Sequence, residues 1–157
     1  MRARYFCLAF ILLIAGCASG VTPGVLPPAV STASRLIIYR PSEFPMGARA
    51  PTVVINGVNS CSIGNGRGFE KDVAPGRVSL STQFWDMPGT SRFSFTASPG
   101  QVYYIKFALS SEAWSGMFAG LIGQGIDQII SKGSGPFNIE LTDESSLNGI
   151  KVGICNL

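Results

Sequence analysis

From residue 35 onward, short apolar runs rich in β-branched residues alternate with turns rich in glycine, proline and asparagine. A turn interrupts the chain about every 8–12 residues, which is the spacing typical of a β-sandwich. Asn56-Gly57 is the strongest turn signal, because both residues accept the positive φ angles of a tight hairpin. We therefore predict a mainly β fold, an antiparallel β-sandwich of about seven strands.

The predicted strands between residues 35 and 109 each end at a turn or a proline. They cover residues 35–40, 52–55, 58–63, 69–73, 77–85, 91–96 and 101–109. In the last of them Tyr103, Ile105 and Phe107 share one face, since side chains alternate along a strand. Residues 137–141 form a further predicted strand, and residues 151–155 a last short one.

After residue 111 the apolar residues change to helical spacing. They are Trp114, Met117, Phe118, Leu121, Ile122, Ile129 and Ile130. This spacing predicts one amphipathic helix over residues 112–131, near the C-terminus. The same range holds Gly116, Gly120, Gly123 and Gly125. Each glycine costs a helix about 1 kcal/mol relative to alanine, so this helix needs support from other elements.

The apolar stripe of the predicted helix needs a surface to pack on. Either it closes one face or end of the sandwich, or it meets a partner. Gly116 and Gly120 are four residues apart and leave a smooth surface on which another backbone can pack closely. With Trp114, they are the candidate partner face.

The N-terminus has the features of an export signal. Arg2 and Arg4 precede an apolar run over residues 5–15, which suits a signal peptide and is short for a membrane span. The residues Ile14-Ala15-Gly16-Cys17 at its end resemble the bacterial lipobox, in which the cysteine becomes the acylated first residue of the mature protein. The alternative is an ordinary secretory signal that happens to carry a cysteine.

The lipobox resemblance implies a domain organisation and a location. Residues 1–16 are the predicted lipoprotein signal peptide, and residues 17–34 are a flexible tether without charged residues. Residues 35–157 form the sandwich domain. Lipobox cysteines carry a diacylglyceryl group and an amide-linked chain, which together anchor a protein stably. Ala18 follows the cysteine in place of the aspartate that retains enteric lipoproteins in the inner membrane. We expect an outer-membrane lipoprotein that faces the periplasm of a bacterium.

Processing leaves an even pair of cysteines. Cys7 departs with the signal peptide and Cys17 is lipidated, so Cys61 and Cys155 remain in an oxidising compartment. We predict a disulfide between them. The alternative is two buried free thiols. Two cysteines without histidine do not make a zinc site, so no metal is predicted.

The composition argues against several functions. Without Arg2 and Arg4 the chain has ten basic and nine acidic residues, which gives no electrostatic case for nucleic-acid binding. The chain contains no histidine, the commonest general base in enzymes. We predict no catalytic residues and no cofactor, and we interpret Glu70, Lys71 and Asp72 as a solvated strand face.

Two further chemistries are alternatives. Asp143 and Glu144 could form a carboxylate pair for hydrolysis, although a polar turn explains them more simply. Aromatic residues could form a sugar-binding platform, although such residues more often fill a sandwich core. They are Phe84, Trp85, Tyr103 and Tyr104.

Several motifs occur in a distinctive order behind the lipobox. They are Ile38-Tyr39-Arg40-Pro41, the run PTVVING at residues 51–57, Phe69 with Ala74-Pro75-Gly76-Arg77, and GQVYYI at residues 100–105. In this order they resemble an uncharacterised bacterial lipoprotein family, domain-of-unknown-function family 2846. The resemblance implies a sandwich like those of transthyretin-type and PEGA-type modules, which are extracytoplasmic interaction or structural domains.

The functional expectation follows from the lipobox, the fold and this resemblance. We expect a lipid-anchored envelope lipoprotein that acts as a non-catalytic binding or assembly module, with a protein of the envelope as its partner. The alternative is a lipoprotein that contacts glycan or peptidoglycan. The sequence does not indicate an oligomeric state.

Overall fold

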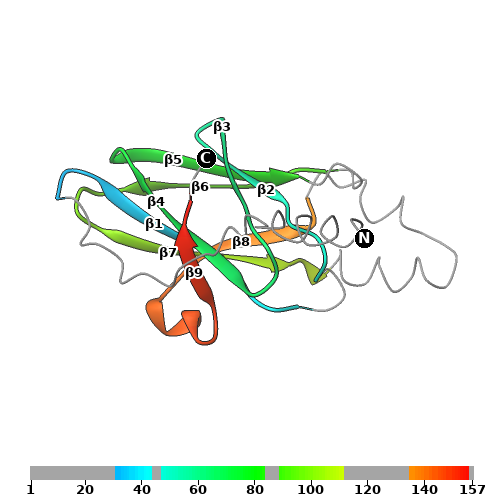
Figure 1. Cartoon of the computed structure of the whole chain (residues 1–157). Coiled ribbons are helices and arrows are strands. Elements are labelled where there is room, and N and C mark those ends of the chain that lie inside the picture. Colours follow the sequence, from blue (N-terminus) through cyan, green and yellow to red (C-terminus); the bar gives the residue numbers. More distant parts are fainter. Residues whose placement is uncertain (1–30, 44–46, 84–88, 112–134, 156–157) are drawn as a thin grey trace, which may run out of the picture.

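The chain folds into two β-sheets that pack face to face, as the computed structural model in Figure 1 shows. The structure describes residues 31–43, 47–83, 89–111 and 135–155. One sheet has five strands in the order β8-β7-β1-β4-β9, and the other has four in the order β3-β2-β5-β6. The strands are β1 (Ser34–Arg40), β2 (Thr52–Ile55), β3 (Val58–Ser62), β4 (Arg67–Val73), β5 (Gly76–Gln83), β6 (Ser91–Ala97), β7 (Val102–Leu109), β8 (Phe137–Thr142) and β9 (Lys151–Ile154).

The core lies between the two sheets and uses alternate residues of each strand. Strand β1 sits in the middle of its sheet and is buried along its whole length. Its Leu36 and Ile38 are fully buried against Val53 of β2 and Val78 and Leu80 of β5, in one apolar cluster. Removing apolar surface from water is the main favourable term in such packing, at about 25 cal/mol per Å².

The predicted β-sandwich is confirmed, but two details of the prediction are wrong. The five-stranded sheet is mixed rather than antiparallel, because β1 pairs with β7 and β4 with β9 in parallel. The described residues form nine strands rather than about seven: the segments predicted at residues 137–141 and 151–155 are β8 and β9, and both join the sandwich as edge strands of this sheet. Turn signals predict antiparallel pairing of strands that follow one another in the chain. They carry no information about pairing between strands that are separated by many residues.

The prediction of a helix as part of this fold is also wrong. The described residues contain one short 3-10 helix, η1 (Glu144–Leu147), and no α-helix, and none of their helices is long and apolar enough to cross a membrane. The predicted helix over residues 112–131 lies outside the described residues. Its basis was weak in physical terms, since four glycines in one helix offset much of what its apolar stripe could contribute.

A strap over residues 143–150, which includes η1, joins the two edges of the five-stranded sheet. It leaves β8 at one edge, crosses the side of the sheet that faces away from the other sheet, and enters β9 at the opposite edge (Figure 1). The hydroxyl groups of Tyr39 on β1 and Thr142 at the end of β8 are hydrogen-bonded at 3.0 Å. This side-chain bond links the start of the strap to the central strand, and the path of the strap explains how β9 reaches β4.

A candidate binding site at the open edge of the sandwich

A disulfide closes one edge of the sandwich. Cys61 on β3 is bonded to Cys155, which follows β9, with 5.9 Å between the two Cα atoms. This confirms the predicted pairing, and it links the edge strand of one sheet to the edge of the other. The Ser60 hydroxyl lies 3.6 Å from the Cys155 sulfur, beside the bond.

A β-bulge brings Cys61 into position. Val54 pairs with Asn59 and Thr52 pairs with Ser62, so the single residue Val53 of β2 faces two residues of β3. Those two residues are Ser60, which is buried, and Cys61, which forms the disulfide. A bulge of this kind re-aims a side chain at a sheet edge.

Beyond the disulfide the same edge is open and contains a cavity of about 200 Å³. It lies between the β2–β3 hairpin and the second half of β4. Its lining consists of Ile55, Asn56, Val58, Asn59, Ser60, Lys71, Val73 and Ala74. Val58 at its rim is 66% exposed, so an apolar side chain beside the cavity is accessible from solvent.

The cavity is open because β9 is short. β9 pairs with residues 67–70 of β4 and ends at Ile154, which is 61% exposed. Among the described residues, no strand lies beside residues 71–73 on that side of β4, or beside β3 on its outer side. Two strand edges therefore flank the cavity with backbone groups that pair with none of the described strands.

Lys71 carries the charge in the cavity. It pairs in register with the core residue Leu36, so its side chain is on the face of β4 that looks toward the other sheet. Its neighbours Glu70 and Asp72 are on the opposite face, where both contact Arg35. Within the described ranges Lys71 has no carboxylate at ion-pair distance. The prediction of one solvated face for these three residues is therefore wrong, because the strand separates their charges.

The Asn56-Gly57 turn forms the rim of the cavity. Asn56 has φ 50° and Gly57 has φ 81°, as the hairpin prediction requires. The Asn56 side-chain oxygen accepts hydrogen bonds from the Ser79 amide at 2.8 Å and from the Ser79 hydroxyl at 3.4 Å. These bonds fix the turn against β5, so the rim is preorganised.

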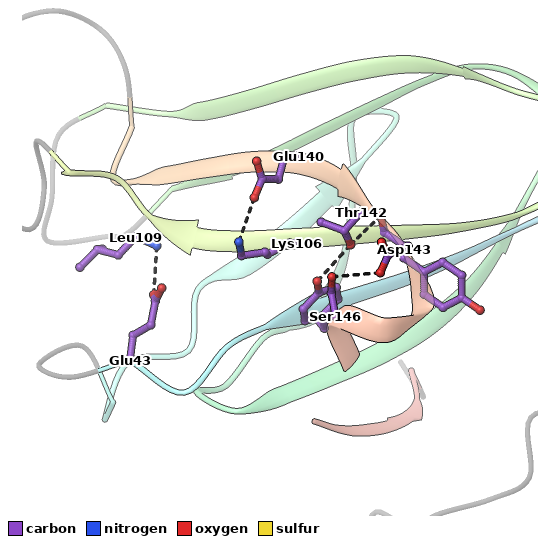
Figure 2. A network of polar contacts seen from close by, with 9 residues as sticks. Glu43, Lys106, Leu109, Glu140, Thr142, Asp143 and Ser146 are labelled. Carbon is purple, nitrogen blue, oxygen red and sulfur yellow. Dashed lines mark hydrogen bonds and ion pairs between the residues drawn. The ribbon is translucent and has the colours of Figure 1, made fainter. Parts of the chain in front are cut away.

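The polar groups in Figure 2 belong to the far side of the five-stranded sheet. Lys106 on β7 is bonded to Glu140 on β8 at 2.9 Å, and this hydrogen bond raises the pKa of Lys106. At the end of β7 the Leu109 amide donates to Glu43 at 3.0 Å. The carboxylates of Glu140 and Glu43 each accept a hydrogen bond from a group on β7. These contacts stabilise the sheet, and both carboxylates are already used by partners within the protein.

The predicted carboxylate pair does not converge on a pocket. Asp143 accepts hydrogen bonds from Ser145 and Ser146 within its own turn (Figure 2), which lower its pKa. Glu144 lies instead near Tyr104, where burial chiefly, and the Glu144 charge in addition, raise the tyrosine pKa. The two acids thus have separate structural partners, as expected for a polar turn.

The remaining predicted site residues divide into two groups. Cys17, Trp114, Gly116 and Gly120 lie outside the described residues, as do Phe84 and Trp85 of the sugar-platform alternative. Tyr103 and Tyr104 are described and point to opposite faces of β7, so they cannot form one platform. The described ranges also contain no group of three acidic, histidine or cysteine side chains placed to hold a metal.

Sequence comparison identifies the family. Residues 31–120 match the family described as a protein of unknown function, DUF2846. The chain belongs to the DUF2846 family. No curated protein matches it significantly. The residues lining the cavity all fall inside the part of the chain that matches DUF2846, whereas β9 and Cys155 lie beyond it.

The Tyr39-Arg40-Pro41 motif of this DUF2846 member ends the central strand. Arg40 is fully buried, and burial lowers its pKa because the charged form is desolvated. Its guanidinium donates to the Arg49 carbonyl at 2.6 Å and lies 5.3 Å from the centre of the Phe137 ring. The motif thus connects β1, the loop before β2 and the start of β8, and its role is architectural.

Sequence reasoning did not find the cavity. Lys71 and Val58 appear in the sequence as an ordinary charged residue and an ordinary strand residue. The pattern does contain one usable signal, because Val58 pairs with Ile55 across the predicted Asn56-Gly57 hairpin and must share its inward face. The sequence pattern does not show where β9 ends. The inward face is accessible at this edge because β9 ends opposite Glu70 and does not cover the rest of β4.

Proposed function

We propose that this protein is a lipid-anchored lipoprotein of the bacterial envelope, attached through Cys17, that acts as a non-catalytic binding or assembly module. The open edge of the sandwich supports a binding role most directly. A preorganised cavity there adjoins two strand edges and an exposed Val58. The Cys61–Cys155 disulfide supports an oxidising compartment, since such bonds persist outside the cytosol.

The proposed location follows from the N-terminus. The lipid on Cys17 inserts into the periplasmic face of the outer membrane, and the predicted tether over residues 17–34 leads to the sandwich, whose β1 begins at Ser34. A sandwich on a tether of this kind can reach envelope proteins while it remains at the membrane. The transthyretin-type and PEGA-type resemblance is compatible with the same role, because it implies an extracytoplasmic interaction or structural domain.

A photo-crosslinking residue at position 58 tests this function in intact cells. We expect discrete cross-linked complexes with an envelope protein from position 58. The matched control is position 102, because Val102 is also an exposed valine, 38% accessible, but begins β7 on the other sheet. Cys17→Ser should reduce the complexes by releasing the protein from the membrane. Equal cross-linking from both positions, or none from position 58, would contradict the proposal.

A glycan-contacting function is the second candidate, and the aromatic residues of the opposite edge favour it. Phe93 and Phe95 on β6 and Tyr103 on β7 are partly buried and in ring contact, with centroids 4.9 Å apart for Phe95 and Tyr103. All three rings also pack against the core, so a sugar would stack only on the sides that stay exposed at this edge. Sedimentation of the full-length protein with isolated cell wall tests it, and loss of sedimentation in Phe93→Ser would support it.

A further inference from the structure

The size of the open-edge cavity limits what it can hold. Its volume of about 200 Å³ is below the roughly 300–1,000 Å³ of pockets that enclose small-molecule ligands. The apolar part of the lining comes from Ile55, Val58, Val73 and Ala74. A cavity of this size and lining suits one large apolar side chain that belongs to a larger partner.

The strand edges beside the cavity indicate the form of that partner. The outer side of β3 and residues 71–73 of β4 present backbone donors and acceptors that no described strand pairs with. An extended peptide satisfies such groups by lying along the edge, as in strand addition. The partner segment is therefore extended, and its alternate side chains face the cavity.

Lys71 sets the charge of the segment. Lys71 lines the cavity from the inward face of β4, while Arg35 holds Glu70 and Asp72 on the other face of the sheet. A carboxylate on the partner would supply the ion pair that Lys71 lacks within the described chain. In an extended peptide, residues two apart point the same way, so the apolar and acidic side chains are two positions apart.

We propose that the open-edge cavity binds an extended segment of a partner protein that carries an apolar side chain and a carboxylate two residues apart. The apolar side chain enters between Ile55, Val58 and Val73, and the carboxylate pairs with Lys71. This inference rests on the proposed binding function and names the chemistry of the partner at that same site.

Selection from a randomised display library of short linear peptides tests the proposal. The full-length wild-type protein, in detergent, serves as bait beside Lys71→Glu. We expect wild type to enrich peptides with an apolar residue two positions from an acidic one. Lys71→Glu should enrich an apolar residue two positions from a basic one. Lys151→Glu is the matched control, because Lys151 is an exposed strand lysine opposite Arg67, away from the cavity.

Affinities of the enriched peptides provide a second measurement. Replacing the acid of a peptide by its amide should weaken binding to wild type about three- to fivefold and leave binding to Lys71→Gln unchanged. Val58→Ser should weaken every enriched peptide, while Val102→Ser should weaken none. Thermal unfolding of each variant verifies that it is folded. Because Val58 is exposed, Val58→Ser should leave the fold intact, and it tests the site even if a substitution at Lys71 destabilises the domain.

The results separate this inference from the function on which it rests. No enrichment, enrichment without an acid, or the same preference in Lys71→Glu as in wild type would overturn the peptide chemistry. If position 58 still cross-links to an envelope protein in cells, the binding function stands and only the partner's chemistry is wrong. If neither peptides nor cross-links are found, both proposals fail.

Discussion

Arg35 on β1 binds the carboxylate of Asp72 on β4 through two hydrogen bonds, 2.8 Å from Nε and 3.0 Å from Nη2. Such a bidentate ion pair is stronger than a pair joined by a single hydrogen bond. The same guanidinium lies 3.6 Å from Glu70, so one cation contacts both acids on this face. Strand alternation places Lys71, between them in sequence, on the cavity side, where no carboxylate of the described residues lies at ion-pair distance.

Asp72→Asn should lower the free energy of unfolding at pH 7 by about 1 kcal/mol or less, because the carboxylate is 36% exposed and solvent screens the pair. The Arg35 hydrogen bond lowers the Asp72 pKa. A lowered folded-state pKa stabilises the fold above the unfolded pKa of about 3.9, and this stabilisation is lost as the pH falls through the folded value. Urea unfolding at pH 7 and near pH 2 should therefore show a deficit only at pH 7. An equal deficit at both would contradict the assignment.

Cys155→Ser should lower the free energy of unfolding by about 2–5 kcal/mol, the usual cost of losing a native disulfide. The bond closes a loop with a sequence separation of 94 residues, and it holds β9 at the sheet edge. Cys61→Ser and the double variant should lose no more than the single variant. Urea unfolding of oxidised and reduced wild type gives the comparison. If reduction left the unfolding midpoint unchanged, the bond would not stabilise the domain.

Gly68→Ala should destabilise the domain by about 1–3 kcal/mol through overpacking. Gly68 pairs with Tyr39, and an added Cβ would lie 2.9 Å from both the Ile38 carbonyl oxygen and the Tyr39 Cβ. Gly64→Ala is the control, since its Cβ would meet only the flexible Arg67 side chain at 3.4 Å. Thermal unfolding should separate the two variants. Similar melting temperatures would show that the sheet relaxes around the methyl group.

The sequence predicts best those features that local chemistry decides. The Asn56-Gly57 hairpin follows from two residues that accept positive φ. The Cys61–Cys155 bond joins distant residues, and it was predictable because these two cysteines are left when the proposed signal peptide and the proposed lipidation of Cys17 account for the other two. The parallel pairing of β1 with β7 has no local signal, because it depends on how two distant strands meet in one sheet.

The candidate site was harder to predict for the same reason. The cavity exists because β9 stops opposite Glu70 and leaves the rest of β4 uncovered. β9 begins only after the strap has crossed the sheet, so its position along β4 depends on how distant parts of the chain meet and not on a local pattern. Helical spacing over residues 112–131 was likewise a local pattern, and its glycines argued against using it to define the fold.

Cys17→Ser should abolish lipidation without changing the stability of the domain. Ile14-Ala15-Gly16-Cys17 lies behind a charged, apolar leader, and the described sandwich begins with β1 at Ser34. Metabolic labelling with a palmitate analogue should mark wild type and leave Cys17→Ser unmarked. Because Cys61 and Cys155 pair with each other, both proteins should unfold at the same urea concentration. Label on Cys17→Ser, or an unlabelled wild type with a free N-terminus elsewhere, would refute anchoring through this cysteine.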